Sequence, residues 1–262
     1  MRSPFLQATG LLKYIGLFLS GVCHQLPEHS LFISGVQMPL CARCMGMYLG
    51  AELALCSSWW RGRSRASKFP PGNVLILLSI FFTFYIVDGL NSYFYFFAGR
   101  PALYTPNNFL RLAAGMASGL SLSLLVLPLF NCTLWRKPDN ERIITAKREL
   151  FVILLQAIAL GWLLQSDISV LLYPLLLASL LSVLSLLTLV NTTIVALLFH
   201  REQHVGSWGE AWFFLILGLG LSIIEVSSLA LLRYLSALAL SVSSSENGLS
   251  FNPFILISCK IK

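Results

Sequence analysis

Charged side chains are scarce in this chain. Asp, Glu, Lys and Arg together supply only 11% of its 262 residues, whereas 56% of the residues are hydrophobic. Soluble globular domains carry about 25% charged residues, so the scarcity excludes an ordinary water-soluble domain. The mean hydropathy of +0.77 is typical of a chain that crosses a membrane several times.

Regular alternation of polar and apolar residues is also missing, and a membrane-spanning β-barrel would need it. Helices satisfy their own backbone groups inside the bilayer. We therefore predict an all-α fold, a polytopic transmembrane helix bundle with six to seven spans. Six runs have about the length of a span: residues 40–60, 73–97, 109–130, 150–165, 168–198 and 211–240.

The first apolar run, residues 4–22, is the candidate for a seventh span. Lys13 interrupts it, and a cleaved signal peptide is the competing interpretation. Val22 fits poorly before a lipoprotein cleavage site, and Cys23 is more useful as part of the motif that follows. We therefore keep this run as part of the mature chain.

Acidic residues are fewer than basic ones, 11 against 18, which gives a net charge of +7. The basic residues cluster in short loops between apolar runs, as topology signals do, so nucleic acid is not an expected partner. The loop RGRSRASK at 61–68 predicts a cytoplasmic side in a cell (inner) membrane, with the cysteine motif on the outer side. The predicted organisation is an N-terminal membrane domain at 1–130, a basic cytoplasmic loop at 131–149, C-terminal transmembrane helices at 150–240, and a tail at 241–262 without assigned structure.

A phosphate-binding glycine loop and a Ser-His-Asp set are both lacking, and the chemistry concentrates instead in residues 23–50. Cys23, His24, Cys41 and Cys44 offer three thiols and an imidazole, which is a complete tetrahedral set for zinc or another transition metal. Adjacent Cys23 and His24 cannot easily reach the same ion. The motif therefore predicts either four ligands or three with one position left open.

Two other interpretations compete with a metal site. Pro39 is a helix-start signal, which would place Cys41 and Cys44 in the first turns of a helix beside Arg43, where a thiolate is stabilised. These cysteines would then be the redox pair of a thiol-disulfide oxidoreductase with quinone as the electron acceptor and Cys23 as a third thiol. A non-catalytic membrane scaffold is the third interpretation, and the sequence leaves open whether the protein is an enzyme.

The predicted topology brings further polar residues to the outer side. Asp88 lies within a span, where an ionisable residue is costly and usually functional, and Arg111 is its expected ion partner. A structural clamp between two helices is the alternative role of this pair. We expect a pocket that faces the lipid bilayer's outer side and binds an unidentified small molecule or ion. Its candidate catalytic residues are Asp88, Arg111, Arg43 and Tyr48, and its candidate binding residues are Gln25, Asn91 and Asn108.

Gly46 and Gly50 form a G-x-x-x-G pair in the same run as Cys44. Small residues at this spacing allow two helix backbones to approach closely within a membrane. The pair predicts a helix-packing surface next to the cysteines.

The strings CHQLPEHS at 23–30 and GVQMPLCARCMGMYLG at 35–50 carry a family resemblance. With Asp88-Gly89 and Asn108-x-x-Arg111, they resemble the domain of unknown function 2085 family of prokaryotic membrane proteins, over about residues 15–125. His29 stands where the family pattern usually has arginine, and Met45 where it usually has threonine. The resemblance implies a membrane location and no particular reaction.

Overall fold

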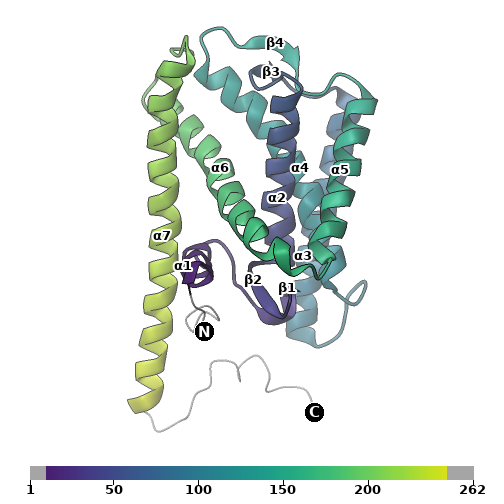
Figure 1. Ribbon diagram of the computed structural model, residues 1–262, viewed down its shortest axis with the longest axis vertical. Coiled ribbons are helices and arrows are strands. Elements are labelled where there is room, and N and C mark those ends of the chain that lie inside the picture. Colours follow the sequence, from purple (N-terminus) through teal and green to yellow (C-terminus); the bar gives the residue numbers. More distant parts are fainter. Residues whose placement is uncertain (1–9, 247–262) are drawn as a thin grey trace.

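The computed structural model describes residues 10–246, and within that range the predicted helix bundle is confirmed (Figure 1). The long helices are α2 (Ala42–Trp60), α3 (Gly72–Ala98), α4 (Asn108–Leu134), α5 (Lys147–Gln165), α6 (Leu172–Leu198) and α7 (Trp208–Glu246). A short helix, α1 (Gly10–Leu19), precedes them. Single 3-10 turns lie at Pro27–His29 and Ser169–Leu171. Residues 241–246 of the expected tail continue α7, and the remainder of the tail with Cys259 lies outside the described residues.

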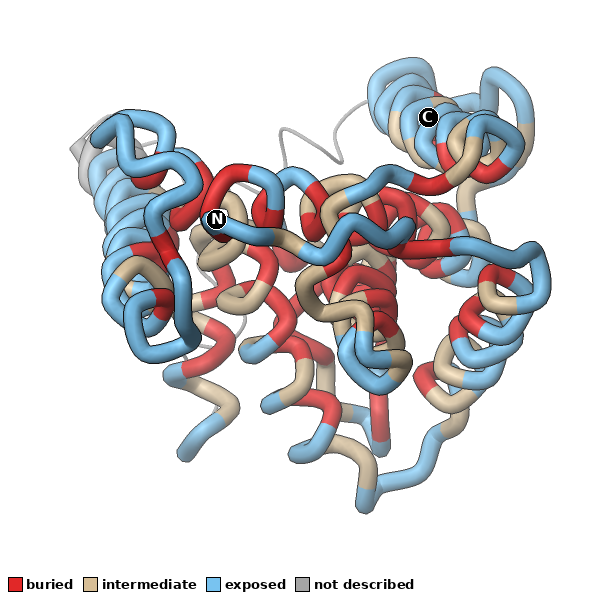
Figure 2. The backbone as a smooth tube through the Cα atoms, turned by 90° about the horizontal axis from the view of Figure 1, so that it is seen from above, coloured by how far each residue is buried: buried red, intermediate tan, exposed pale blue. Residues whose placement is uncertain are grey.

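Five helices of the described range, α3 to α7, are long and apolar enough to cross a membrane. The sixth expected span corresponds to α2, which runs alongside them through the middle of the bundle (Figure 1). Its composition is less apolar because it carries Arg43, Glu52 and several small residues. Seen along the bundle, buried residues concentrate at the centre and exposed ones face outward (Figure 2), as expected of helices surrounded by lipid.

The pairing of α2 with α4 is the most extensive helix contact in the bundle. Glycines from both helices make it possible: a Cβ on Gly46 or Gly50 would overlap the α4 backbone, and one on Gly115 or Gly119 would overlap the α2 backbone. The predicted packing surface of Gly46 and Gly50 is confirmed. Backbones in such close contact fix the position of α2, and with it the cysteines at its start.

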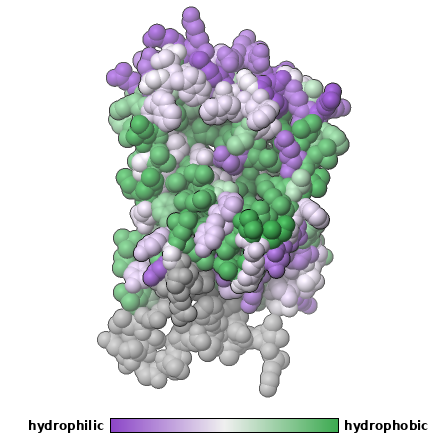
Figure 3. Space-filling view, viewed as in Figure 1, coloured by the Kyte–Doolittle hydropathy of each residue, from purple (hydrophilic) through white to green (hydrophobic). Residues whose placement is uncertain are grey.

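The basic loops meet at one end of the bundle. Strand β3 (Ala66–Lys68) pairs in parallel with β4 (Asp139–Arg142), although about seventy residues separate them in sequence. Glu149 at the start of α5 receives hydrogen bonds from Arg61 and Arg63, at 3.3 and 2.5 Å. Hydrophilic residues gather over this end, and a hydrophobic belt lies below it (Figure 3). The two loops that the sequence assigns to one side therefore form one basic cap.

The first apolar run departs from the expected span. Its described part forms α1, ten residues that are seen nearly end-on in Figure 1 while α7 is seen side-on. A ten-residue helix is about 15 Å long, whereas a bilayer core is about 30 Å thick. Residues 10–19 thus lie across the bundle rather than through it, and residues 1–9 lie outside the described range. The side chain of Gln25 anchors α1 by donating to the carbonyl of Gly16, at 2.7 Å.

The connection between α1 and α2 contains an antiparallel hairpin of β1 (Ser30–Ile33) and β2 (Val36–Cys41). The prediction that Pro39 starts a helix is wrong, because Pro39 lies inside β2 and the helix begins at Ala42. Cross-strand pairing of Ser30 with Cys41 keeps this stretch extended. Cys41 consequently caps α2 instead of lying within it.

Candidate metal centre

Three cysteines meet at the end of the bundle opposite the basic cap. The backbone N–H of Cys41 donates to the Cys23 sulfur at 3.1 Å, and the N–H of Cys44 donates to the Cys41 sulfur at 3.5 Å. Cys23 and Cys41 are buried, Cys44 is half-buried, and all three are free thiols. The α1–β1 loop, the end of β2 and the first turn of α2 thus converge on one cluster.

The donor atoms of Cys23, His24 and Cys41 all lie within 4.8 Å of one another. The Cys23 sulfur is 3.6 Å from Nδ1 of His24. Zinc–sulfur and zinc–nitrogen bonds of about 2.3 and 2.1 Å at a tetrahedral angle give a separation of about 3.6 Å. The two adjacent residues therefore present their donor atoms close together, contrary to the expectation that they could not easily reach the same ion. Cys44 is not a member of this group.

His29 supports the imidazole of His24 from behind. Nε2 of His24 is 3.1 Å from Nδ1 of His29. Burial, followed by the nearby charge of Arg111, lowers the pKa of His29 to about 4, so its imidazole is neutral near pH 7 and Nδ1 can accept. His24 then donates from Nε2 to Nδ1 of His29, and the lone pair on Nδ1 of His24 faces the Cys23 sulfur. Metal-binding histidines commonly have such a partner on their second nitrogen.

The thiols of Cys23 and Cys41 differ in acidity. Hydrogen bonding with Cys23, followed by that with Cys44, lowers the pKa of Cys41 well below its usual value. Hydrogen bonding with Cys41, together with burial, raises the pKa of Cys23 to about 12. Cys41 is therefore the first of the two to become a thiolate, and the thiolate is the form that binds metal or attacks a disulfide.

Arg233 of α7 holds the loop that carries Cys23 and His24. Its guanidinium donates to the carbonyls of Ser20, at 2.9 Å, of Cys23, and of His24, at 2.7 Å. One charged side chain thereby satisfies three loop carbonyls from more than two hundred residues away in sequence. This residue was not among the sequence candidates.

Asp88 pairs with Arg43 and not with Arg111. The carboxylate of Asp88 is fully buried, and it accepts from Nε of Arg43 at 2.9 Å and also from Nη2. Arg43 donates further to the hydroxyl of Ser92 at 2.8 Å, and the Tyr104 hydroxyl donates to Asp88 at 2.7 Å. The sequence prediction of an Asp88–Arg111 pair is wrong, because α2 and not α4 presents the cation to this face of α3.

Arg111 lies in α4 without a carboxylate partner among the described residues. Its side chain is buried, and Nη1 donates to the side-chain oxygen of Asn108 at 2.9 Å. Nε has no hydrogen-bond partner within the described part of the chain. Asn108 in turn donates to the backbone carbonyl of Ser30 in β1, at 3.1 Å. Arg111 is thus a buried cation beside the hairpin with hydrogen-bonding capacity to spare.

The remaining candidates brace the surrounding loops. Gln25 is buried with φ of +57°, and besides Gly16 it donates to the carbonyl of Pro39 at 2.9 Å. Asn91 donates to the carbonyl of Tyr104, at 2.8 Å, and accepts from the N–H of Leu103, at 3.0 Å. The geometry fits positioning roles for both amides. Tyr48 is buried farther along α2.

The similarity of this chain to known proteins lies mainly in the region that contains the cysteine cluster. A family model described as "Predicted membrane protein (DUF2085)" matches residues 23–125. An uncharacterized protein of Methanothermobacter thermautotrophicus is 30% identical over 105 residues, which are 40% of this chain and 83% of the relative. The chain belongs to the DUF2085 family.

Another relative of the chain is the uncharacterized protein MJ1492 of Methanocaldococcus jannaschii. It is 28% identical over 135 residues, which are 50% of this chain and 80% of the relative. No solved structure matches the chain. The matched residues 23–125 contain the cysteine cluster, Asp88 and Arg111, whereas α5 to α7, including Arg233, lie outside the match.

Proposed function

We propose that this membrane protein binds zinc or a similar transition metal at the outer end of its bundle, through Cys23, His24 and Cys41. The observation that carries the proposal is the convergence of these three donor atoms within 4.8 Å. Zinc accepts such a mixture of sulfur and nitrogen ligands. Cys44 or an external donor would complete a tetrahedron, and an external donor would make the site open to a ligand.

Arg111 gives the open position a chemical preference. It is buried beside the hairpin, and its Nε has no hydrogen-bond partner among the described residues. A guanidinium in that state favours an anionic ligand, because charge-assisted hydrogen bonds to a carboxylate or phosphate would satisfy it. We assign Arg111 to anion binding and Arg43 with Asp88 to positioning α2 against α3.

Metal analysis of the purified full-length protein tests the proposal. The unsubstituted protein is expected to hold about one zinc ion per chain, and Cys41→Ser or Cys23→Ser to reduce bound zinc at least about tenfold, because each removes a ligand. His29→Ala should weaken zinc binding by about 10- to 100-fold through loss of the second-nitrogen contact of His24. Elemental analysis and competition with a zinc indicator measure both effects.

Cys132→Ser is the matched control, because Cys132 is an exposed thiol outside the cluster. It should leave zinc content unchanged. Zinc absent from the unsubstituted protein even after incubation with the metal, or lost equally in Cys132→Ser, would contradict the proposal.

A redox role is the second candidate, favoured by the lowered pKa of Cys41 at the cap of α2. Cys41 and Cys44 would release two protons and two electrons to form a disulfide, with a quinone as acceptor. Thiol counting before and after reduction on the same preparations separates the candidates. A reducible Cys41–Cys44 bond without zinc supports the redox role. If the cysteine variants keep the same zinc content and the same change in thiol count on reduction as the unsubstituted protein, only the scaffold interpretation remains.

We place the protein in a prokaryotic inner membrane with the basic cap in the cytoplasm, because basic loops are retained on that side. In intact cells an impermeant thiol reagent is then expected to label Glu28→Cys in the outer loop and not Glu202→Cys between α6 and α7. Both positions are exposed. Labelling of the unsubstituted protein gives the background from native cysteines. The opposite pattern would put the cysteine cluster inside the cell.

A further inference from the structure

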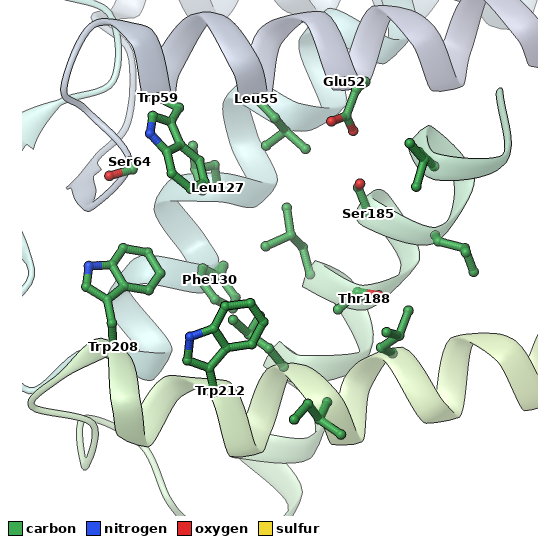
Figure 4. Close-up of a pocket in the computed structure, with 16 residues that line it drawn as sticks. Glu52, Leu55, Trp59, Ser64, Leu127, Phe130, Ser185, Thr188, Trp208 and Trp212 are labelled. Atoms are coloured by element: carbon green, nitrogen blue, oxygen red, sulfur yellow. The ribbon is translucent and has the colours of Figure 1, made fainter. Parts of the chain in front are cut away.

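A second site lies in the half of the bundle nearer the basic cap, away from the cysteines. It is a cavity of about 470 Å³ between α2, α4, α6 and α7. It extends from Glu52, midway along α2, to Trp208 at the start of α7 (Figure 4). Cavities of about 300–1,000 Å³ with few polar groups are typical of small-molecule sites.

The cavity has a carboxylate that the described part of the chain does not neutralise. Glu52 makes no ion pair with any described residue, and its Oε2 is buried with no hydrogen-bond partner. Its Oε1 lies 3.6 Å from the Cys56 thiol. An ionisable side chain at membrane depth is costly unless it meets a partner. A cation entering the cavity would supply that partner.

The polar groups near Glu52 are acceptors or neutral hydroxyls. Ser185 and Thr188 of α6 also line the cavity. The Ser185 hydroxyl points from α6 toward Glu52 of α2 (Figure 4). The Thr188 hydroxyl is buried without a hydrogen-bond partner in residues 10–246. No lysine, arginine or histidine is among the described residues that line the cavity. The lining therefore opposes an anion.

Three indoles complete the lining at the end nearer the cap. Trp59, Trp208 and Trp212 border the cavity, with Trp59 on the α2 side and Trp208 and Trp212 on the α7 side (Figure 4). Tryptophan is the aromatic side chain that attracts cations most strongly. A cation already packs on this aromatic cluster outside the cavity: the Arg65 guanidinium lies 4.0 Å from the ring centre of Trp135, which contacts Trp208 edge-on.

We propose that this cavity binds a lipophilic organic cation, such as a quaternary ammonium compound or a protonated hydrophobic amine. The apolar body lies among the leucines of α6 and α7, and the charge is shared between Glu52 and the indoles. Access is from the bilayer between helices, where such molecules concentrate. This site is independent of the zinc proposal, because it shares no residue with the cysteine cluster.

Two ions of nearly the same size and shape test the charge preference: tetraphenylphosphonium, a cation, and tetraphenylborate, an anion. Equilibrium binding of each is measured on the full-length protein in nanodiscs, with empty nanodiscs subtracted. We expect saturable binding of tetraphenylphosphonium only, and Glu52→Gln to weaken it at least about tenfold, because a desolvated ion pair is lost. Trp212→Leu should also weaken binding of tetraphenylphosphonium, because it removes an indole that attracts the cation. Trp212 is exposed at 61%, so its replacement spares the core.

Glu141→Gln, an exposed residue of the basic cap, is the matched control and should bind as the unsubstituted protein does. Unchanged thermal stability of Glu52→Gln would show that the variant folds and has lost only binding. Its zinc content should also be unchanged, because the cavity shares no residue with the cysteine cluster. Equal binding of the two ions would show a lipid-like apolar cavity only. That result, or full binding by Glu52→Gln, would overturn the proposal.

Discussion

Replacing Gly119 with alanine is expected to destabilise the protein more than any other single methyl group added to the bundle. The new Cβ would overlap the carbonyl oxygen of Met47 and lie 2.8 Å from the backbone nitrogen of Ala51. Overpacking costs about 1–3 kcal/mol when side chains can adjust. Here backbone meets backbone, so we expect a loss of at least about 3 kcal/mol. Denaturant unfolding in detergent measures it.

The displacement should also reach the candidate metal centre. Because α2 begins directly after Cys41, separating α2 from α4 moves that sulfur relative to Cys23 and His24. Zinc content in the variant should therefore fall together with stability. A stable Gly119→Ala protein with full zinc content would contradict the close approach of α2 and α4.

Gly161→Ala is the matched control for this prediction. A Cβ at Gly161 in α5 would be 3.7 Å from the terminal methyl of Met116, an ordinary contact. Alanine is the better helix former by about 1 kcal/mol, so this variant should be neutral or slightly more stable. The two substitutions add the same atom, and only the surroundings differ.

Asp88→Ala is the second substitution with a large expected effect. It leaves the half-buried Arg43 guanidinium without its fully buried carboxylate partner and removes the acceptor of the Tyr104 hydroxyl. Breaking a buried ion pair by removing one partner costs about 3–5 kcal/mol. We expect a loss of that size in denaturant unfolding.

Removing both charges should cost less than removing one. In Arg43→Met combined with Asp88→Leu, no unpaired charge remains buried, and such replacements are often close to neutral. Asp139→Ala in exposed β4 is the surface control and should change stability by no more than about 0.5 kcal/mol. If Asp88→Ala unfolds like Asp139→Ala, the pair does not stabilise the bundle.

Much of the bundle follows from the sequence because hydropathy and the placement of basic residues are direct physical signals. The six runs predicted as spans correspond to α2 to α7, and the loops predicted on one side form one cap. The first run was the candidate for a seventh span, and its described part does not cross the bundle lengthwise, for a reason that hydropathy does not report. Apolar length is needed to cross a membrane, yet Gly10–Leu19 is held across the bundle by a hydrogen bond from Gln25 and by contacts with α6 and α7.

The candidate site was predictable in its residue types and less so in its pairings. The predicted ligands were Cys23, His24, Cys41 and Cys44, and the donor atoms of all but Cys44 lie within 4.8 Å of one another. Which arginine meets Asp88 depends on the rotation of α2 and α4 about their axes, and no local pattern reports that rotation. His29 left a signal in its departure from the family pattern. Arg233 left none, because a lone arginine near the end of a span more often reflects topology.

The reach of Arg233 sets an order for biogenesis. Cys23 and His24 leave the ribosome early, whereas the side chain that fixes their loop belongs to α7, the last helix described. Domains generally form from the N-terminus during translation, but this loop has to wait until α7 has been inserted beside it. Until then its thiols are open to oxidation or to stray metals, so the mature arrangement of this loop depends on the synthesis of α7.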